Sequence, residues 1–196
     1  MRRAAQVLYL KLVKSRTQST KHLCARLTAE NEQREMAEEF KIVKTNELDV
    51  QAKQQVFDLW NNEYPANLSY NSLAEFDNYL QNITKLKHYL LRSAKGQVLG
   101  WALTFERDSE TWFAIILSEE IKGKGFGKKM LNLLKQDEPI LNGWVIDHNN
   151  DVKKNGLKYH SPLKFYEKCG FEIQSGVMLK HEKISAVKVQ WTKEKQ

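Results

Sequence analysis

The sequence predicts one domain that mixes α-helices with β-strands and extends over residues 36–196. Three observations predict this fold class. Strand-like and helical patterns alternate along the chain, two apolar runs have the composition of strands buried on both faces, and a glycine-rich turn joins the first of these runs to an amphipathic helix. Elements in such an order bury their apolar surface by packing helices against a sheet, so we expect an α/β (α+β) domain.

The first half of the domain is predicted to hold a strand, two helices and a β-hairpin. Pro65 ends the first helix, because proline cannot continue it. Gly96 lies in the short turn of the hairpin. The expected elements are a strand at 40–44, helices at 50–64 and 73–80, and strands at 88–92 and 98–105.

The second half is predicted to hold two buried strands, each followed by a helix, and two final strands. In the first of these helices Phe126, Met130 and Leu134 recur every four residues and form one apolar face. Ser161-Pro162 is typical of a helix start and Gly170 of a helix end. The expected elements are a strand at 111–117, a helix at 124–135, a strand at 144–146, a helix from 162 to 169, and strands at 171–174 and 184–191.

Composition excludes several classes of protein. No apolar run approaches the ~20 residues that a membrane-spanning helix needs. The two cysteines, Cys24 and Cys169, are too few for a disulfide framework or a thiolate metal site. We therefore expect a soluble protein of a reducing compartment, with no metal and no membrane partner.

The net charge of +7 is concentrated in residues 1–35, which hold eight of the 31 Lys and Arg residues but three of the 24 Asp and Glu residues. The domain is therefore nearly neutral and has no nucleic-acid reader motif, so we expect no nucleic-acid partner. Basic, Ser- and Thr-containing residues 1–35 have the composition of an organelle transit peptide, whereas Met36 offers an alternative start. We expect a cytoplasmic protein, or an organelle-matrix protein if residues 1–35 are a transit peptide.

The strongest local signal is the segment 117–129, where a buried strand passes through a glycine-rich turn into a helix. Helix starts bind phosphate through free N–H groups and a positive dipole end, and glycines let the backbone approach a ligand. A Walker loop does not fit because Lys128 is followed by Lys129, and the glycine spacing is too short for a dinucleotide fingerprint. Taken alone, the segment fits a phosphate site or a plain turn with solvated lysines equally well.

A second motif, Tyr166-Glu167-Lys168-Cys169-Gly170-Phe171, lies ~40 residues downstream. Together the two motifs resemble the GCN5-related N-acetyltransferase (GNAT) superfamily, and the resemblance covers about residues 40–192. The family's acyl-CoA loop, Arg/Gln-x-x-Gly-x-Gly/Ala, is matched by Lys122, Gly125 and Gly127, and its late Tyr-Glu-Lys-x-Gly-Phe segment by 166–171. The resemblance implies the GNAT fold, with a mixed, mostly antiparallel sheet, a splayed parallel strand pair and flanking helices.

The resemblance also implies roles for individual residues. Acetyl-CoA would be the co-substrate, with no metal, and Tyr166 would protonate the departing CoA thiolate. The main chain at Ile116, Leu117 and Ser118 would hold the pantetheine arm. The pyrophosphate would be held by the loop residues Lys122, Gly123, Lys124, Gly125, Phe126, Gly127, Lys128 and Lys129.

Three positions depart from the family pattern. Lys122 stands where the family has Arg or Gln, and it offers a point charge instead of a guanidinium fork. Tyr159 replaces an Asn that often precedes the tyrosine by seven residues, and Asn155 or Ser161 are alternatives for its contact with pantetheine. Glu119 stands where proline is frequent and brings a negative charge near the phosphate loop.

An amine acceptor, with a pKa near ~10, must lose a proton before it attacks. Asp147 and His148 follow the second buried strand and are the preferred bases, although strand-end polar residues are usually just solvated. Glu110, His160 or a water chain are alternatives. Trp60, Tyr64 and Tyr70 lie where the family builds its acceptor pocket, although helically spaced aromatics, Trp60 above all, more often belong to the core.

We therefore expect an acetyl-CoA-dependent N-acetyltransferase in which a primary amine attacks directly in a ternary complex. The expected acceptor is a small molecule rather than a protein, and the expected assembly is a monomer or a homodimer. The alternative is a GNAT-fold module that binds acyl-CoA without turnover, which the departures at Lys122 and Tyr159 suggest.

Overall fold

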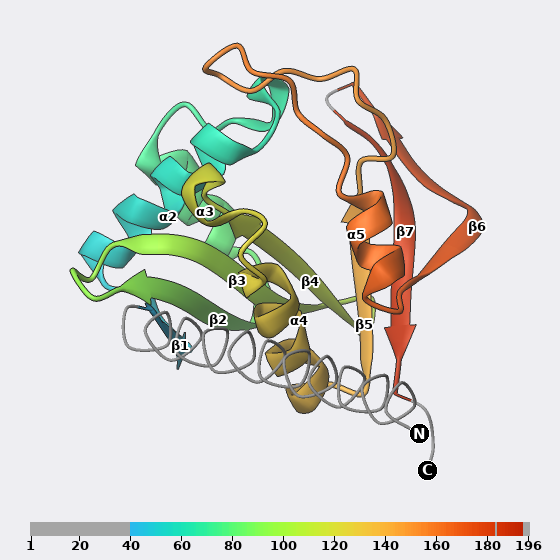
Figure 1. Cartoon of the computed structure of the whole chain (residues 1–196), viewed down its shortest axis with the longest axis horizontal. Helices are drawn as coiled ribbons and strands as arrows, with labels where there is room; N and C mark the ends of the chain where they lie inside the picture. The colour runs from blue at the N-terminus through green and yellow to red at the C-terminus, as the bar shows by residue number, and fades with distance from the viewer. Residues whose placement is uncertain (1–39, 183, 194–196) are drawn as a thin grey trace, which may run out of the picture. The chain divides into compact units, whose positions relative to one another are not determined.

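The computed structural model describes residues 40–182 and 184–193 (Figure 1). The interpretations of residues 1–35 and of Met36 lie outside these residues. Within the described part, the sheet order is β1-β2-β3-β4-β5-β7-β6. The strands are β1 Phe40–Thr45, β2 Thr84–Ser93, β3 Val98–Arg107, β4 Glu110–Leu117, β5 Ile140–Val145, β6 Glu172–His181 and β7 Ile184–Thr192, and the helices are α2 Val50–Glu63, α3 Leu73–Gln81, α4 Phe126–Asp137 and α5 Leu163–Lys168.

This order of strands and helices confirms the predicted fold class and element sequence. The sheet is antiparallel except for the neighbours β4 and β5, which run parallel and are bonded at Trp112 and Asn142, in the first half of each strand. Beyond this pair the two strands separate toward their carboxyl ends, and Figure 1 shows them diverging. The splayed parallel pair therefore leaves an opening in the sheet after Leu117 and Val145.

Helices cover both faces of the sheet, and β4 shows how its sequence serves both layers. Trp112 and Ile116 belong to the core that α2 and α3 form with β3. Phe113, which alternation directs to the opposite face, packs against Tyr166 of α5 with ring centroids 5.7 Å apart. The continuous apolar run of β4 is thus explained, because a strand covered on both faces has no position for an exposed polar residue.

Local sequence signals place the end of α2 beside the opening. The Asp49 carboxylate caps the helix by accepting a hydrogen bond of 2.7 Å from the Ala52 N–H. The helix ends at Glu63 because Tyr64 has an extended backbone before Pro65. Glu63 and Tyr64 therefore lie at the end of α2, beside the opening between β4 and β5.

Several predicted boundaries differ from the structure. Strand β2 begins at Thr84 instead of residue 88, and β6 extends to His181 instead of residue 174. Helix α4 begins at Phe126 instead of residue 124, because Gly125 takes a left-handed conformation (φ +82°) and occupies the cap. Strand β5 begins four residues earlier than predicted, since Asn142 and Gly143 hid its pattern although both are buried. Pro162 caps α5 in place of Ser161, whose hydroxyl still accepts a hydrogen bond of 3.2 Å from the Leu163 N–H.

Candidate functional site

A cavity of about 680 Å³ occupies the opening of the sheet. The carboxyl end of β4, the glycine-rich loop and α5 form its walls, and a segment between β5 and α5 adds a further wall. Its volume is in the range of small-molecule sites. The lining residues are Glu63, Tyr64, Ile115, Ile116, Leu117, Glu119, Ile121, Lys122, Gly123, Gly125, Phe126, Gly127, Lys128, Lys153, Leu157, Lys158, Tyr159, His160, Pro162, Phe165 and Tyr166.

The glycine-rich loop reaches the start of α4 through two left-handed glycines, Gly123 (φ +78°) and Gly125 (φ +82°). Gly127 has a different role, because an added Cβ would lie 3.0 Å from a ring atom of Phe165 in α5. The loop thus turns sharply and lets α4 approach α5 closely. The N–H groups of a first helical turn have no partners within the helix, which makes this cavity wall suitable for an anion.

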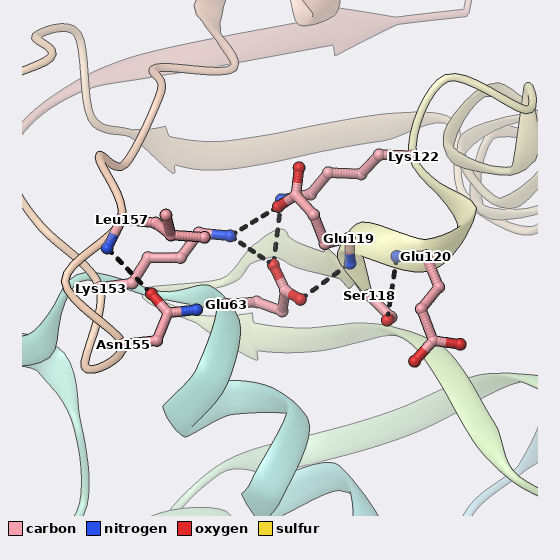
Figure 2. Close-up of polar contacts among 8 residues, drawn as sticks. All are labelled: Glu63, Ser118, Glu119, Glu120, Lys122, Lys153, Asn155 and Leu157. Carbon is pink, nitrogen blue, oxygen red and sulfur yellow. Dashed lines mark hydrogen bonds and ion pairs between the residues drawn. The ribbon is translucent and has the colours of Figure 1, made fainter.

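Lys122 lines the cavity, and its ammonium belongs to a cluster of two lysines and two glutamates (Figure 2). Its ammonium lies 3.0 Å from the Glu63 carboxylate and 2.7 Å from that of Glu119. The Lys153 ammonium contacts the same two carboxylates at 2.8 and 2.7 Å. The Glu119 N–H also donates to Glu63 at 2.8 Å. We call these four residues the ion cluster.

Glu63, Glu119 and Lys153 are held in their charged forms at neutral pH. Hydrogen bonds from Lys122 and Lys153 lower the pKa of Glu119 to about 2. Burial would raise the pKa of Glu63, but hydrogen bonds from both lysines and from the Glu119 N–H outweigh it and lower that pKa. Burial would lower the pKa of Lys153, but its bonds to both carboxylates raise it. Neither carboxylate is therefore suited to accept a proton from a substrate amine.

Tyr166 projects from α5 into the cavity wall and is 6% exposed. Its ring packs against Phe113 at 5.7 Å and Phe171 at 5.6 Å between centroids. Burial raises its pKa, so the phenol is protonated at neutral pH and can donate a proton. Tyr64 and Tyr159 line the same cavity, and burial raises the pKa of Tyr159 to about 12.

The preferred bases lie outside the cavity lining. His148 accepts a 3.4 Å hydrogen bond from the Asn150 N–H, and its Nδ1 lies 3.9 Å from the Asp151 carboxylate. Asp147 is exposed at the end of β5. Glu110 is paired with Lys188 at the start of β4. Among the four side chains weighed as bases, only His160 lines the cavity.

The three aromatic residues considered for the acceptor pocket differ in position. Tyr64 lines the cavity, whereas Trp60 and Tyr70 pack against the core cluster. The Trp60 indole donates a 2.8 Å hydrogen bond to the Leu68 carbonyl, and its ring lies 4.5 Å from that of Tyr64. This packing favours the core interpretation of Trp60, whose ring fixes the position of the cavity-lining Tyr64 ring.

The remaining predicted residues have local roles in the described structure. Ser118 lies outside this cavity: its N–H donates to the Leu99 carbonyl at 2.8 Å, and its hydroxyl accepts from the Glu120 N–H. Lys124 and Lys129 are exposed beside the cavity lining. The Cys169 thiol has a pKa raised by burial, which disfavours a nucleophile.

Over residues 40–182 and 184–193, no helix is long and apolar enough to cross a bilayer, and no three His, Cys, Asp or Glu side chains are grouped to hold a metal ion.

Sequence reasoning missed Glu63 and Lys153 in the site. They are 90 residues apart, and a glutamate at a helix end or a lysine in a polar loop normally indicates a solvated side chain. The available signal was Glu119, which departs from the family's proline and stands three residues before Lys122. That spacing indicated one ion pair but not the buried partners.

Comparisons with known proteins agree with this fold. A family model described as an acetyltransferase (GNAT) domain matches residues 85–173, which span β2 to the start of β6 and include the glycine-rich loop, Lys153 and Tyr166. No curated protein matches the chain.

Solved structures with a similar fold include N-acetyltransferases. One, assigned as a phosphinothricin N-acetyltransferase, has a TM-score of 0.59 and 15% identity, covering 79% of this chain and 100% of that one. The spermidine N-acetyltransferase of Vibrio cholerae in complex with CoA and spermine has a TM-score of 0.54 and 15% identity, covering 78% of this chain and 95% of that one. At these identities the likeness shows the fold alone.

Proposed function

We propose that the protein is an acetyl-CoA-dependent N-acetyltransferase that acetylates a primary amine of a small molecule. The match of a GNAT acetyltransferase family model to residues 85–173 supports this proposal. The observation that carries the proposal is that a single cavity joins a glycine-rich helix start, suited to phosphate, to the buried phenol of Tyr166. The spermine bound to the V. cholerae neighbour supports a small-molecule acceptor. The amine attacks directly, with both substrates bound together.

The chemistry of the lining divides the cavity into parts for a long, amphipathic co-substrate. The start of α4 at Gly127 and Lys128 would hold the pyrophosphate through N–H groups and a nearby ammonium. The end of β4 at Ile116 and Leu117, which has no β5 partner, would hold the pantetheine amides. When bound, acetyl-CoA supplies a thioester whose thiol, with a pKa near about 8.5, is a fair leaving group.

The chain itself moves two protons in this mechanism. Tyr166, kept protonated by burial, donates its phenolic proton to the departing sulfur. A base takes a proton from the amine so that its lone pair can attack. Asp147 and His148 at the end of β5, and His160 in the cavity wall, are the protein groups for this step.

The test is turnover of acetyl-CoA over a panel of small amines, followed by thiol release. We expect release with at least one amine, and a fall in kcat of ~10²-fold or more in Tyr166→Phe, in the usual range for loss of a general acid. Tyr79→Phe is the matched control, because Tyr79 is a half-buried phenol of α3 outside the cavity lining. Undiminished turnover in Tyr166→Phe would remove its role, and tight CoA binding without turnover would favour a non-catalytic binding module.

A further inference from the structure

The cavity wall between β5 and α5 is a small hairpin formed by residues 151–159. The Lys153 N–H donates to the Leu157 carbonyl at 2.8 Å, and the Tyr159 N–H donates to the Asp151 carbonyl at 3.0 Å. Gly156 closes the turn with a left-handed backbone (φ +80°). These bonds give the hairpin its own shape, but they do not attach it to the rest of the domain.

Attachment comes from one edge of the hairpin, which lies against the chain that leaves α2. The Ala66 N–H donates to the Val152 carbonyl at 2.8 Å, and Pro65 forms a bridge with Lys153. These contacts attach the hairpin through its backbone at Val152 and Lys153. Lys158 and Tyr159, which line the cavity, belong to the other arm of the hairpin, where Lys158 pairs with Val152.

Side-chain burial in the hairpin is the reverse of the usual pattern. Its aliphatic residues Val152 and Leu157 are 50% and 57% exposed, whereas Lys153 is 5% exposed. Lysine is rarely buried unless it is paired. Lys153 is paired with Glu63 at 2.8 Å and with Glu119 at 2.7 Å (Figure 2).

The two carboxylates come from two different walls of the cavity. Glu63 ends α2, and Glu119 lies in the turn that leads from β4 to the glycine-rich loop. Lys153 therefore joins three segments that are distant in the sequence. Removing its ammonium leaves two carboxylates with Lys122 alone, so the remaining charges no longer balance.

We propose that Lys153 is a positioning residue that fastens the 151–159 hairpin to α2 and to the phosphate loop, and thereby holds the hairpin's Lys158 and Tyr159 against bound acyl-CoA. This inference rests on the proposed function and adds a second wall to the co-substrate site, beside that of the glycine-rich loop. It assigns the ion cluster to acyl-CoA affinity and not to the chemical step. Lys158 lines the cavity and provides an exposed cation for the phosphates of the ligand.

The affinity effect follows from the fraction of molecules with a docked hairpin. If Lys153→Met lowers that fraction to about one tenth, the Kd for acetyl-CoA rises about tenfold. At saturating acetyl-CoA the docked state is repopulated, so kcat changes less than about twofold. Lys153→Arg keeps the charge and is expected to recover most of the affinity.

The experiment measures calorimetric Kd for acetyl-CoA and amide hydrogen exchange in the full-length protein. In Lys153→Met we expect weaker binding and faster exchange in peptides covering 151–159, with unchanged exchange in β3 and β4. Lys154→Met is the control, because it removes an exposed lysine of the same hairpin outside the cavity lining. If Lys153→Met does not fold, Glu119→Gln removes a partner that is 63% exposed and serves the same measurements.

The outcomes separate this inference from the proposed function. Unchanged exchange at 151–159, or an unchanged Kd in a folded variant, would overturn the role of Lys153 while leaving the acetyltransferase proposal intact. Absence of acetyl-CoA binding by the unmodified protein would refute the proposed function and the affinity role together, and exchange would still report whether Lys153 fastens the hairpin. A fall in kcat without a change in Kd would contradict the inference by assigning the ion cluster to the chemical step.

Discussion

Gly143→Ala tests whether the Phe113 ring of β4 packs directly against the backbone of β5 at Gly143. Gly143 is buried in β5, and a Cβ added there would lie 2.7 and 2.9 Å from two ring atoms of Phe113. Carbon atoms in contact lie ~3.5–4.0 Å apart, so the ring must retreat by roughly 1 Å. Phe113 itself packs against Tyr166 and Phe171, which leaves it little room.

The expected cost combines two opposing effects. Overpacking a filled core costs about 1–3 kcal/mol, and replacing a strand glycine by alanine returns about 0.5–1 kcal/mol of chain entropy. The free energy of unfolding should therefore fall by about 1–2 kcal/mol. For a domain of this size, that lowers Tm by about 3–6 °C.

The assay is thermal unfolding of four proteins: the unmodified chain, Gly143→Ala, Phe113→Leu and the double variant. Phe113→Leu should also destabilise alone, because it removes buried aromatic surface. In the double variant the smaller side chain accommodates the new methyl group, so its Tm loss should be less than the sum of the single losses. Strictly additive losses, or an unchanged Tm in Gly143→Ala, would refute the proposed packing.

Histidine and carboxylate variants test the site in two further ways. Since His160 lines the cavity and His148 does not, His160→Ala should lower kcat at least about tenfold and more than His148→Ala, and the reverse ranking would return the base to the end of β5. The pKa of Glu119 is about 2 in the folded protein and about 4.3 in an unfolded chain. The contribution of Glu119 to stability is therefore complete above about pH 4.3 and is lost as the pH falls toward 2. Lowering the pH from about 5 to about 3 should therefore reduce the urea midpoint less in Glu119→Gln than in the unmodified protein, and equal reductions would contradict the ion cluster.

The fold could be predicted where its determinants are local in sequence. Hydrophobic periodicity, Pro65 and the glycines at 96 and 125 act within a few residues, so the order of elements was recoverable. The start of β5 was not, because Asn142 is a polar residue buried through distant partners. Its amide donates to the Thr111 carbonyl at 3.1 Å and accepts from Gln190 at 2.9 Å.

The site divides in the same way. The glycine-rich loop and Tyr166 have motifs with fixed local spacing, and the structure brings both to one cavity. Lys153 has no such motif, because its burial depends on Glu63 and Glu119 from two other segments. A lysine in a loop gives the same sequence signal whether it is solvated or paired in the interior. Only the folded chain distinguishes these cases.

The charge balance of the ion cluster has a consequence for how a ligand enters. Two ammonium and two carboxylate groups cancel, so this part of the wall has no net attraction for an anion. Lys128 and Lys158, both exposed, place their ammonium groups at the cavity lining. The two lysines would attract the anionic head of an elongated ligand. Its uncharged tail would then lie in the apolar part of the opening, beside Tyr166. Such a field selects the orientation of the ligand before any specific contact forms.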